Sequence, residues 1–158
     1  MVSKAGLVMI AAASVFALPS AGAQAAWRQV YADRDVRVLF DTASATLSSP
    51  GVWTTVTSWD YSRPRFLENK KSYTRLVERV HIRCSPVRVK RVRSTVYGAN
   101  NTIVRDEGEV DIRDQAAMAW DQPRRATAAA SAFNSVCNVL ARKPAAKKAT
   151  TRTSSGKR

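Results

Sequence analysis

The residues in this sequence best suited to binding chemistry are arginines spaced four positions apart between Ser72 and Cys84. In a β-strand, successive side chains point to opposite faces. Read in this way, the stretch has one mostly apolar face that ends in Cys84 and a second face that carries Arg75, Arg79 and Arg83. An apolar face can anchor a core, and a row of guanidinium groups can contact a polyanion. The pattern predicts a half-buried antiparallel strand with a candidate anion-binding face.

The next basic stretch, from Val87 to Tyr97, widens this face if the two strands form a hairpin. Its apolar phase changes midway, which predicts a β-bulge near Lys90 and Arg91. Depending on the bulge, either Arg88 and Lys90 or Arg91 and Arg93 join the basic face. The candidate partner-binding residues of the sheet are therefore Arg75, Arg79, Arg83, Arg88, Lys90, Arg91 and Arg93. A soluble sheet face whose charges only discourage aggregation is the alternative interpretation.

Residue patterns that support catalysis are sparse. His81 is the only histidine, and its flanking arginines disfavour an imidazolium and offer no orienting carboxylate for a catalytic pair. His81 and Tyr73 share a strand face, but eight residues separate them by about 26 Å, too far for one haem iron. The acidic stretch from Asp106 to Asp114 lacks the offsets of a calcium loop, which favours a solvated loop that balances nearby arginines. We therefore expect no enzyme, no metal site and no cofactor.

Residues 1–25 have the pattern of a secretory signal peptide. Lys4 precedes an apolar run that is too short for a comfortable membrane span, and small residues follow Pro19. Cleavage fits after Ala23 or after Ala25, and an uncleaved N-terminal anchor is the alternative. The pattern predicts an exported protein that acts in the periplasm, at the outer cell surface or outside the cell, with no membrane span after cleavage.

The two cysteines, Cys84 and Cys137, form an even pair. In an exported protein such a pair favours a disulfide. Closing a loop of this length would stabilise the fold by about 4 kcal/mol in the chain-entropy account. Two free buried thiols, or one reactive cysteine, are the alternatives.

The positive charge is spread unevenly over the chain, whose formal net charge is +14. Residues 26–140 carry 18 basic and 12 acidic residues, whereas residues 141–158 carry seven basic residues and no acid. This last segment is too polar to build a core, so we expect a disordered tail that can hold polyanions. Its candidate contact residues are Arg142, Lys143, Lys147, Lys148 and Arg152. The predicted organisation is a signal peptide (1–25), one domain (26–140) and a basic tail (141–158).

Six strand-like segments and one helix would position the candidate residues. The strands are Trp27–Tyr31, Val36–Phe40, Val52–Tyr61, Ser72–Cys84, Val87–Tyr97 and a last strand that starts at Thr102 and fades toward Val110. Ser62–Lys71 reads as a polar loop, and Gly98–Asn101 as a turn that accepts positive φ. Apolar residues from Ala126 to Leu140 recur at helical spacing and include Cys137. The predicted fold is α+β, with about six antiparallel strands, a C-terminal helix packed on one face and one disulfide.

Several short motifs occur in an order that resembles the surface-adhesin protein E family of Gram-negative bacteria. They are Trp27, Phe40-Asp41, Asp60-Tyr61, Lys71-Ser72-Tyr73, Cys84, Tyr97-Gly98, Trp120 with Pro123, and Cys137. The resemblance covers the chain from about Trp27 to Leu140, and the basic tail lies outside it. It implies a six-stranded antiparallel sheet with a helix packed on it and one disulfide. It also implies binding of host extracellular-matrix or serum proteins, with haem binding in some members.

Together these features predict an exported, non-catalytic binding domain that contacts acidic host or envelope macromolecules through its basic surface and tail. The expected partner is an acidic extracellular-matrix protein, lipopolysaccharide or an anionic glycan. One alternative is a structural or accessory envelope protein that forms a homodimer through its sheet. Another is haem or small-ligand binding in a pocket lined by Trp53, Trp59 and Tyr61, although aromatic residues on one strand face more often belong to a core.

Overall fold

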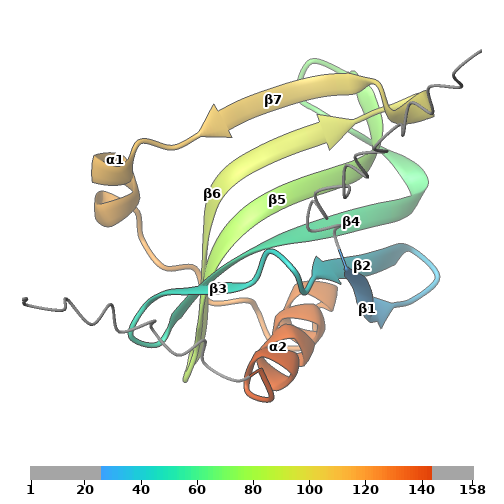
Figure 1. Cartoon of the computed structure of the whole chain (residues 1–158). Coiled ribbons are helices and arrows are strands. Elements are labelled where there is room, and N and C mark those ends of the chain that lie inside the picture. Colours follow the sequence, from blue (N-terminus) through green and yellow to red (C-terminus); the bar gives the residue numbers. More distant parts are fainter. Residues whose placement is uncertain (1–25, 144–158) are drawn as a thin grey trace, which may run out of the picture.

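A computed structural model describes residues 26–143, so the predicted signal peptide and most of the predicted tail lie outside the described residues. Within residues 26–143, seven antiparallel strands form one curved sheet (Figure 1). The strand order is β1-β2-β4-β5-β6-β7, and β3 pairs with β4 beside this path. The strands are β1 (Trp27–Ala32), β2 (Val36–Asp41), β3 (Thr46–Ser49), β4 (Val52–Phe66), β5 (Ser72–Cys84), β6 (Val87–Tyr97) and β7 (Ile103–Glu109). This architecture confirms the predicted fold class.

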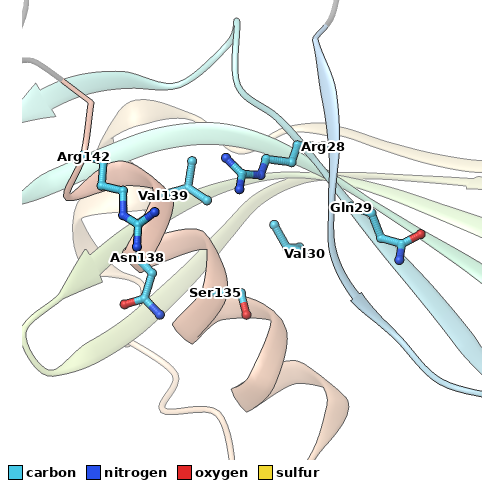
Figure 2. A pocket seen from close by; sticks show the side chains of 7 residues that line it. All are labelled: Arg28, Gln29, Val30, Ser135, Asn138, Val139 and Arg142. Carbon is cyan, nitrogen blue, oxygen red and sulfur yellow. The ribbon is translucent and has the colours of Figure 1, made fainter.

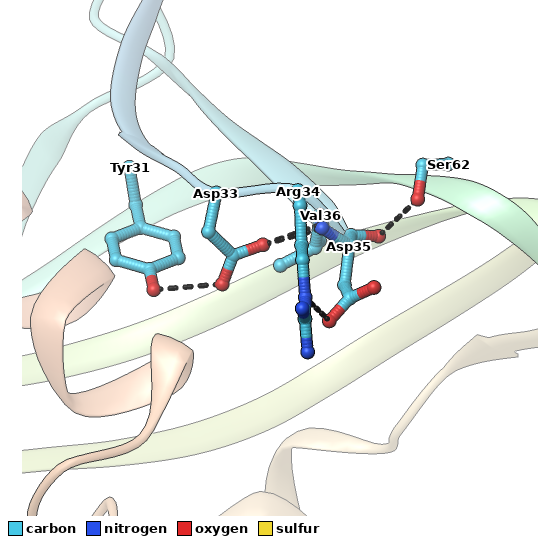
Figure 3. Close-up of polar contacts among 6 residues, drawn as sticks. All are labelled: Tyr31, Asp33, Arg34, Asp35, Val36 and Ser62. Carbon is cyan, nitrogen blue, oxygen red and sulfur yellow. Dashed lines mark hydrogen bonds and ion pairs between the residues drawn. The ribbon is translucent and has the colours of Figure 1, made fainter.

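A polar turn centred on Asp33 joins β1 to β2 (Figure 3). One oxygen of the Asp33 carboxylate accepts hydrogen bonds from the backbone N–H groups of Asp35 and Val36, each at 2.8 Å. The other oxygen accepts a hydrogen bond from the Tyr31 hydroxyl at 2.8 Å. These bonds to backbone and hydroxyl hold the pKa of the Asp33 carboxyl below its usual range. The turn fixes where the edge strand β1 lies against β2.

The alternation of β5 divides the sheet into two faces. Val80 and Ile82 are fully buried on the side that α2 (Ala128–Leu140) covers, which we call the helix face. Arg75, Arg79 and Arg83 alternate with them and so lie on the opposite side, which we call the open face. The observed bounds of β5 match the predicted strand from Ser72 to Cys84.

The core lies between the helix face and α2. Val38 and Phe40 from β2 meet Val136 and Leu140 from the helix, and all four side chains are buried. The other buried apolar members of this cluster include Val36, Trp59, Val80, Ile82, Val89, Ala132 and Phe133. Removing such side chains from water is the main favourable contribution to folding.

Helix α2 is held to the sheet by packing and by a covalent bond. The Thr127 hydroxyl accepts a hydrogen bond from the Ala130 N–H and caps the first turn. Ten residues later, Cys137 forms a disulfide with Cys84 at the end of β5, with 5.5 Å between the two Cα atoms. The predicted disulfide is confirmed, and it joins the last residue of β5 to the apolar stripe of α2.

Three elements differ from the sequence-based expectation. The short strand β3 was not predicted, and it forms a tight hairpin with β4 through Gly51, whose φ of 72° suits glycine. Strand β4 continues to Phe66, into the segment predicted to be a polar loop, with an irregular register between Asp60 and Arg65 that accommodates Pro64. A short helix, α1 (Ile112–Ala117), follows β7 where no periodicity was detected.

The turn between β6 and β7 contains the predicted positive φ values, 55° at Asn100 and 60° at Asn101. These residues belong to a single turn of 3₁₀ helix, η1 (Ala99–Asn101). Gly98 precedes it, and a Cβ atom there would lie 2.9 Å from a methyl carbon of Val104. The turn therefore requires glycine at this point because β7 approaches too closely for a side chain.

Candidate polyanion-binding surface

The β5–β6 hairpin brings the predicted basic residues of two strands together. Its register places Arg83 opposite Arg88, His81 opposite Lys90 and Arg79 opposite Arg93. The register shifts where Arg79 pairs with Arg93 but Val80 pairs with Arg91, which leaves Val92 as the extra residue of a bulge. The predicted bulge is therefore present, within two residues of the predicted position near Lys90 and Arg91.

The bulge settles which arginines share a face. Arg88, Lys90 and Arg93 lie on the open face with the arginines of β5, whereas Arg91 pairs with Val80 and lies on the helix face. Of the two alternatives from the sequence, Arg88 and Lys90 both lie on the open face, whereas the second pair is divided, because the extra residue Val92 lies between Arg91 and Arg93. Arg91 is thus separated from the candidate surface.

Carboxylates from neighbouring strands neutralise the central arginines of the open face. Arg75 donates to Asp60 at 2.8 Å, and Arg37 donates to the same carboxylate at 2.9 Å. Partial burial raises the pKa of Asp60, but the hydrogen bonds and charges of the two guanidinium groups outweigh it and hold that pKa below its usual range. At neutral pH this carboxylate is charged and shared by two cations.

The next two arginines are paired with β7. Arg79 donates to Glu109 at 2.7 Å, and Arg93 donates to Asp106 at 2.9 Å. The hydrogen bond from Arg93 is the largest reason why the pKa of Asp106 lies below its usual range. The first part of the acidic stretch, to Glu109, therefore lies in the edge strand β7 rather than in a loop, and its Asp106 and Glu109 balance two arginines as expected.

Positive charge remains at one end of the open face, on Arg83, Arg88 and Lys90, which we call the basic end. Within residues 26–143, none of these three side chains forms an ion pair with a carboxylate. The Arg83 guanidinium lies 4.3 Å from the centroid of the Trp120 ring, and the Lys90 ammonium lies 4.9 Å from it. Lys90 also donates to the backbone carbonyl of Gln115 at 2.9 Å.

The segment after β7 holds Trp120 against this end. Val89 and Asp121 exchange backbone hydrogen bonds of 2.9 Å in both directions, which attaches the segment to β6. In the sequence Trp120 contributes only to a family resemblance, because no periodic pattern around it indicates a contact with β5. His81 lies beside this cluster, and burial together with the charge of Lys90 lowers its pKa.

Arg91 has a different environment on the helix face, where it pairs with the buried carboxylate of Glu78. Glu78 is only 2% exposed to solvent, and this burial raises the pKa of its carboxyl despite the attraction of Arg91. One carboxylate oxygen has no hydrogen-bond partner of good geometry among residues 26–143, although the guanidinium lies against it. A cavity of about 260 Å³ lies beside this pair and is lined by Tyr73, Ser94 and Arg105 among others.

The described part of the predicted tail is folded onto the domain. The Lys143 ammonium donates to the carbonyl groups of Thr42 and Ala45 at 2.9 and 2.6 Å, in the loop that follows β2. Arg142 is exposed in the turn that follows α2. Lys147, Lys148 and Arg152 lie outside the described residues.

The other candidate ligand sites have structural roles within residues 26–143. Trp59 is buried, and its ring centroid lies 5.9 Å from that of Phe133, while Trp53 and Tyr61 contact the same core. No group of three or more histidine, cysteine, aspartate or glutamate side chains in this part of the chain could hold a metal ion. Among these residues, no helix has the length and apolar character needed to cross a membrane.

No family model, curated protein or solved structure matches the chain.

Proposed function

We propose that the protein is an exported, non-catalytic binding domain that contacts acidic macromolecules through the basic end and the tail. The observation that carries the proposal is the uneven pairing of the open face. Arg75, Arg79 and Arg93 are neutralised by carboxylates, whereas Arg83 and Arg88 at the basic end have none, and the buried Lys90 adds a third charge there. Unpaired cations beside an aromatic ring suit the sulfate, phosphate or carboxylate groups and sugar rings of an anionic glycan.

The export part of the proposal is supported by the Cys84–Cys137 disulfide, because disulfides persist mainly in oxidising compartments. The periplasm, the outer cell surface and the extracellular space all fit this chemistry. The tail adds positive charge that can contact a polyanion, since residues 144–158 carry five basic residues and no acid.

Binding to immobilised heparin, titrated against salt, tests the proposal. We expect binding that weakens steeply as salt rises, because displaced counterions drive association with polyanions. Replacing Arg83 and Arg88 together with glutamine should lower the affinity by roughly tenfold, since each removes a cation that no carboxylate balances. Arg34→Gln is the matched control, because Arg34 is 92% exposed in the β1–β2 turn, where its only ion pair is with Asp35.

Truncation should begin after Lys143, because deleting Lys143 would also remove its hydrogen bonds to the β2 loop. A protein without residues 144–158 should keep salt-sensitive binding that still depends on Arg83 and Arg88. Binding that is insensitive to salt, to the double substitution and to truncation would contradict the electrostatic proposal. Binding that only the truncation abolishes would assign the function to the tail and remove the basic end from it.

Self-association through a sheet edge is a second candidate, since no strand of residues 26–143 pairs with the outer side of β7 and Ile103 in β7 is 62% exposed. The same strand carries Arg105, Asp106, Glu107 and Glu109, and such charges discourage edge-to-edge pairing. We therefore favour the binding proposal. A concentration series in sedimentation equilibrium that shows a stable dimer, together with no affinity for heparin, would reverse this preference.

A further inference from the structure

A groove on the opposite side of the molecule from β7 lies between the edge strand β1 and helix α2 (Figure 2). Its volume is about 310 Å³, and it is lined by Arg28, Gln29, Val30, Ser135, Asn138, Val139 and Arg142. We call it the β1–α2 groove. None of the seven residues belongs to the basic end, so the groove is a separate site from it.

The helix contributes one continuous stripe to this groove. Ser135, Asn138 and Val139 are spaced at i, i+3 and i+4, so they lie on one side of α2, and Arg142 continues this spacing in the turn that follows the helix. The stripe runs for about 10 Å along the helix axis, the length of about three residues of extended chain. It presents two hydrogen-bonding side chains, one apolar contact and, at its end, a cation.

The strand contributes free backbone groups. Within residues 26–143, β1 pairs only with β2, so its other side is a sheet edge in this part of the chain. The Thr42 N–H donates to the Ala26 carbonyl, which places Ala26 in a hydrogen-bonded position facing β2. Because these positions alternate along an antiparallel ladder, Trp27 and Gln29 direct their backbone N–H and C=O groups away from the sheet. An additional strand can pair with these groups.

The charged side chains gather at one end of the groove. Arg28 pairs across the ladder with Phe40, so its side chain lies on the helix face, and Figure 2 shows it reaching toward Val139 and Arg142. Within residues 26–143, neither Arg28 nor Arg142 forms an ion pair. All 12 acidic residues of the chain lie between Asp33 and Asp121, so the segments outside the described residues offer no Asp or Glu to balance them.

We propose that the β1–α2 groove binds the C-terminal end of an extended peptide. The peptide adds as a strand antiparallel to β1, runs alongside α2 and places its terminal carboxylate between Arg28 and Arg142. Strand addition supplies backbone hydrogen bonds at Trp27 and Gln29, and the paired guanidinium groups supply charge-assisted hydrogen bonds to the carboxylate. Antiparallel addition follows from the geometry, because Arg28 lies near the start of β1 and the carboxylate is the last group of the peptide.

Peptide binding can be measured by fluorescence anisotropy with the full chain at physiological ionic strength. The probe is a short N-acetylated, labelled peptide of alternating valine and threonine with a free C-terminal carboxylate. We expect this probe to bind. The same peptide with a C-terminal amide should bind at least roughly tenfold more weakly, because the amide lacks the negative charge that Arg28 and Arg142 would hold. A probe with the carboxylate moved to an internal glutamate and an amidated end should bind like the amide.

Arg28→Gln and Arg142→Gln should each remove the preference for the free carboxylate. Arg63→Gln is the matched control, because Arg63 is exposed on β4 and lines neither the groove nor the basic end. Methylating alternate peptide nitrogens should weaken binding of the free acid without altering the protein, because it blocks pairing with the β1 edge.

Equal affinity for the acid and the amide would overturn the proposal. So would a preference for the acid that Arg28→Gln and Arg142→Gln leave intact but that Arg83→Gln with Arg88→Gln removes, since that result assigns the carboxylate to the basic end. An unchanged affinity for the methylated probe would overturn the strand-addition part. Failure of the heparin experiment affects none of these outcomes, because that experiment varies Arg83, Arg88 and residues 144–158, none of which lines the groove.

Discussion

At the scale of single residues, Glu78 is the most buried ionisable side chain among residues 26–143. It lies on the helix face beside Trp59 and Leu76 rather than on the arginine-rich face. Its partner Arg91 follows the regular alternation of β6 from Val89 and so lies on the helix face opposite Val80. The bulge at Val92 moves the next arginine, Arg93, to the open face, so Arg91 is the arginine of β6 that pairs with Glu78.

The buried carboxylate of Glu78 predicts a characteristic pH dependence of stability. Burial raises its pKa above the ordinary 4.5, so above that pH the folded protein binds more protons than the unfolded chain, and stability falls as pH rises through this range. Glu78→Gln removes this titration. Relative to the wild type, the variant should therefore become more stable as pH rises from about 4 toward about 7, as measured by the unfolding free energy in urea.

Glu68→Gln is the control for this measurement, because Glu68 is exposed in the β4–β5 turn. Its unfolding free energy should follow that of the wild type across the whole range. Parallel pH profiles for Glu78→Gln and the wild type would show that the carboxylate is not protonated preferentially in the folded state.

Lys143 provides a second prediction at this scale. Its ammonium group bonds to two carbonyl groups in the loop after β2, so it fixes the end of α2 to that loop. Lys143→Met keeps the aliphatic stem and should lower the unfolding free energy by about 1–2 kcal/mol in urea denaturation. Arg142→Met, which removes a neighbouring cation with no such bonds, should change stability by less than about 0.5 kcal/mol. Equal effects would indicate a general charge effect at the helix end.

At the scale of elements, the disulfide links β5 to α2 across the core. Cys84 and Cys137 are 53 residues apart, so reducing the bond frees a long loop of the unfolded chain. Replacing both cysteines with serine should lower the unfolding free energy by about 2–4 kcal/mol while the sheet remains folded at room temperature. Urea denaturation followed by tryptophan fluorescence measures the loss, and a wild-type sample unfolded in reductant should reproduce it. Unchanged stability would mean that packing alone positions α2.

The central elements could be predicted from sequence because each shows a single strong period. β5 alternates over its full length, and the apolar stripe of α2 recurs at helical spacing, so their faces and the position of Cys137 followed from local pattern. β3 and α1 were not predicted because they are short and mostly exposed, so burial leaves no periodic pattern in them. The extension of β4 to Phe66 was not predicted because Pro64 and the two arginines beside it are typical of a loop. In the structure this part of β4 has an irregular register, and such an irregular position tolerates proline.

The candidate surface could be predicted only in part for a related reason. The sequence shows which residues alternate along one strand, but pairing between strands decides which charges are neutralised. Asp106 and Glu109 meet Arg93 and Arg79 because β7 lies beside β6, a contact between residues far apart in the chain. The β1–α2 groove could not be predicted from the sequence for the same reason, because Arg28 and Arg142 lie at opposite ends of the domain sequence.

At the scale of the whole molecule, positive charge is arranged in separate places. The basic end lies on the open face, the β1–α2 groove lies at the β1 edge, and residues 144–158 carry five more basic residues. Between the first two, ion pairs neutralise Arg37, Arg75, Arg79 and Arg93. A high net charge alone would not predict this division, which makes separate ligands for separate regions chemically reasonable.

A dependence on ligand length follows from this arrangement if the basic end and the tail hold one polyanion together. A long heparin chain can contact both, so the second contact forms at a high effective concentration, whereas a short oligosaccharide can occupy only one. Deleting residues 144–158 should therefore weaken binding of long heparin by roughly tenfold or more and change binding of a heparin tetrasaccharide much less. Replacing Arg83 and Arg88 with glutamine should weaken both ligands. Isothermal titration at fixed salt measures all four combinations, and equal losses for the long and short ligands on tail deletion would show that the tail does not act together with the basic end.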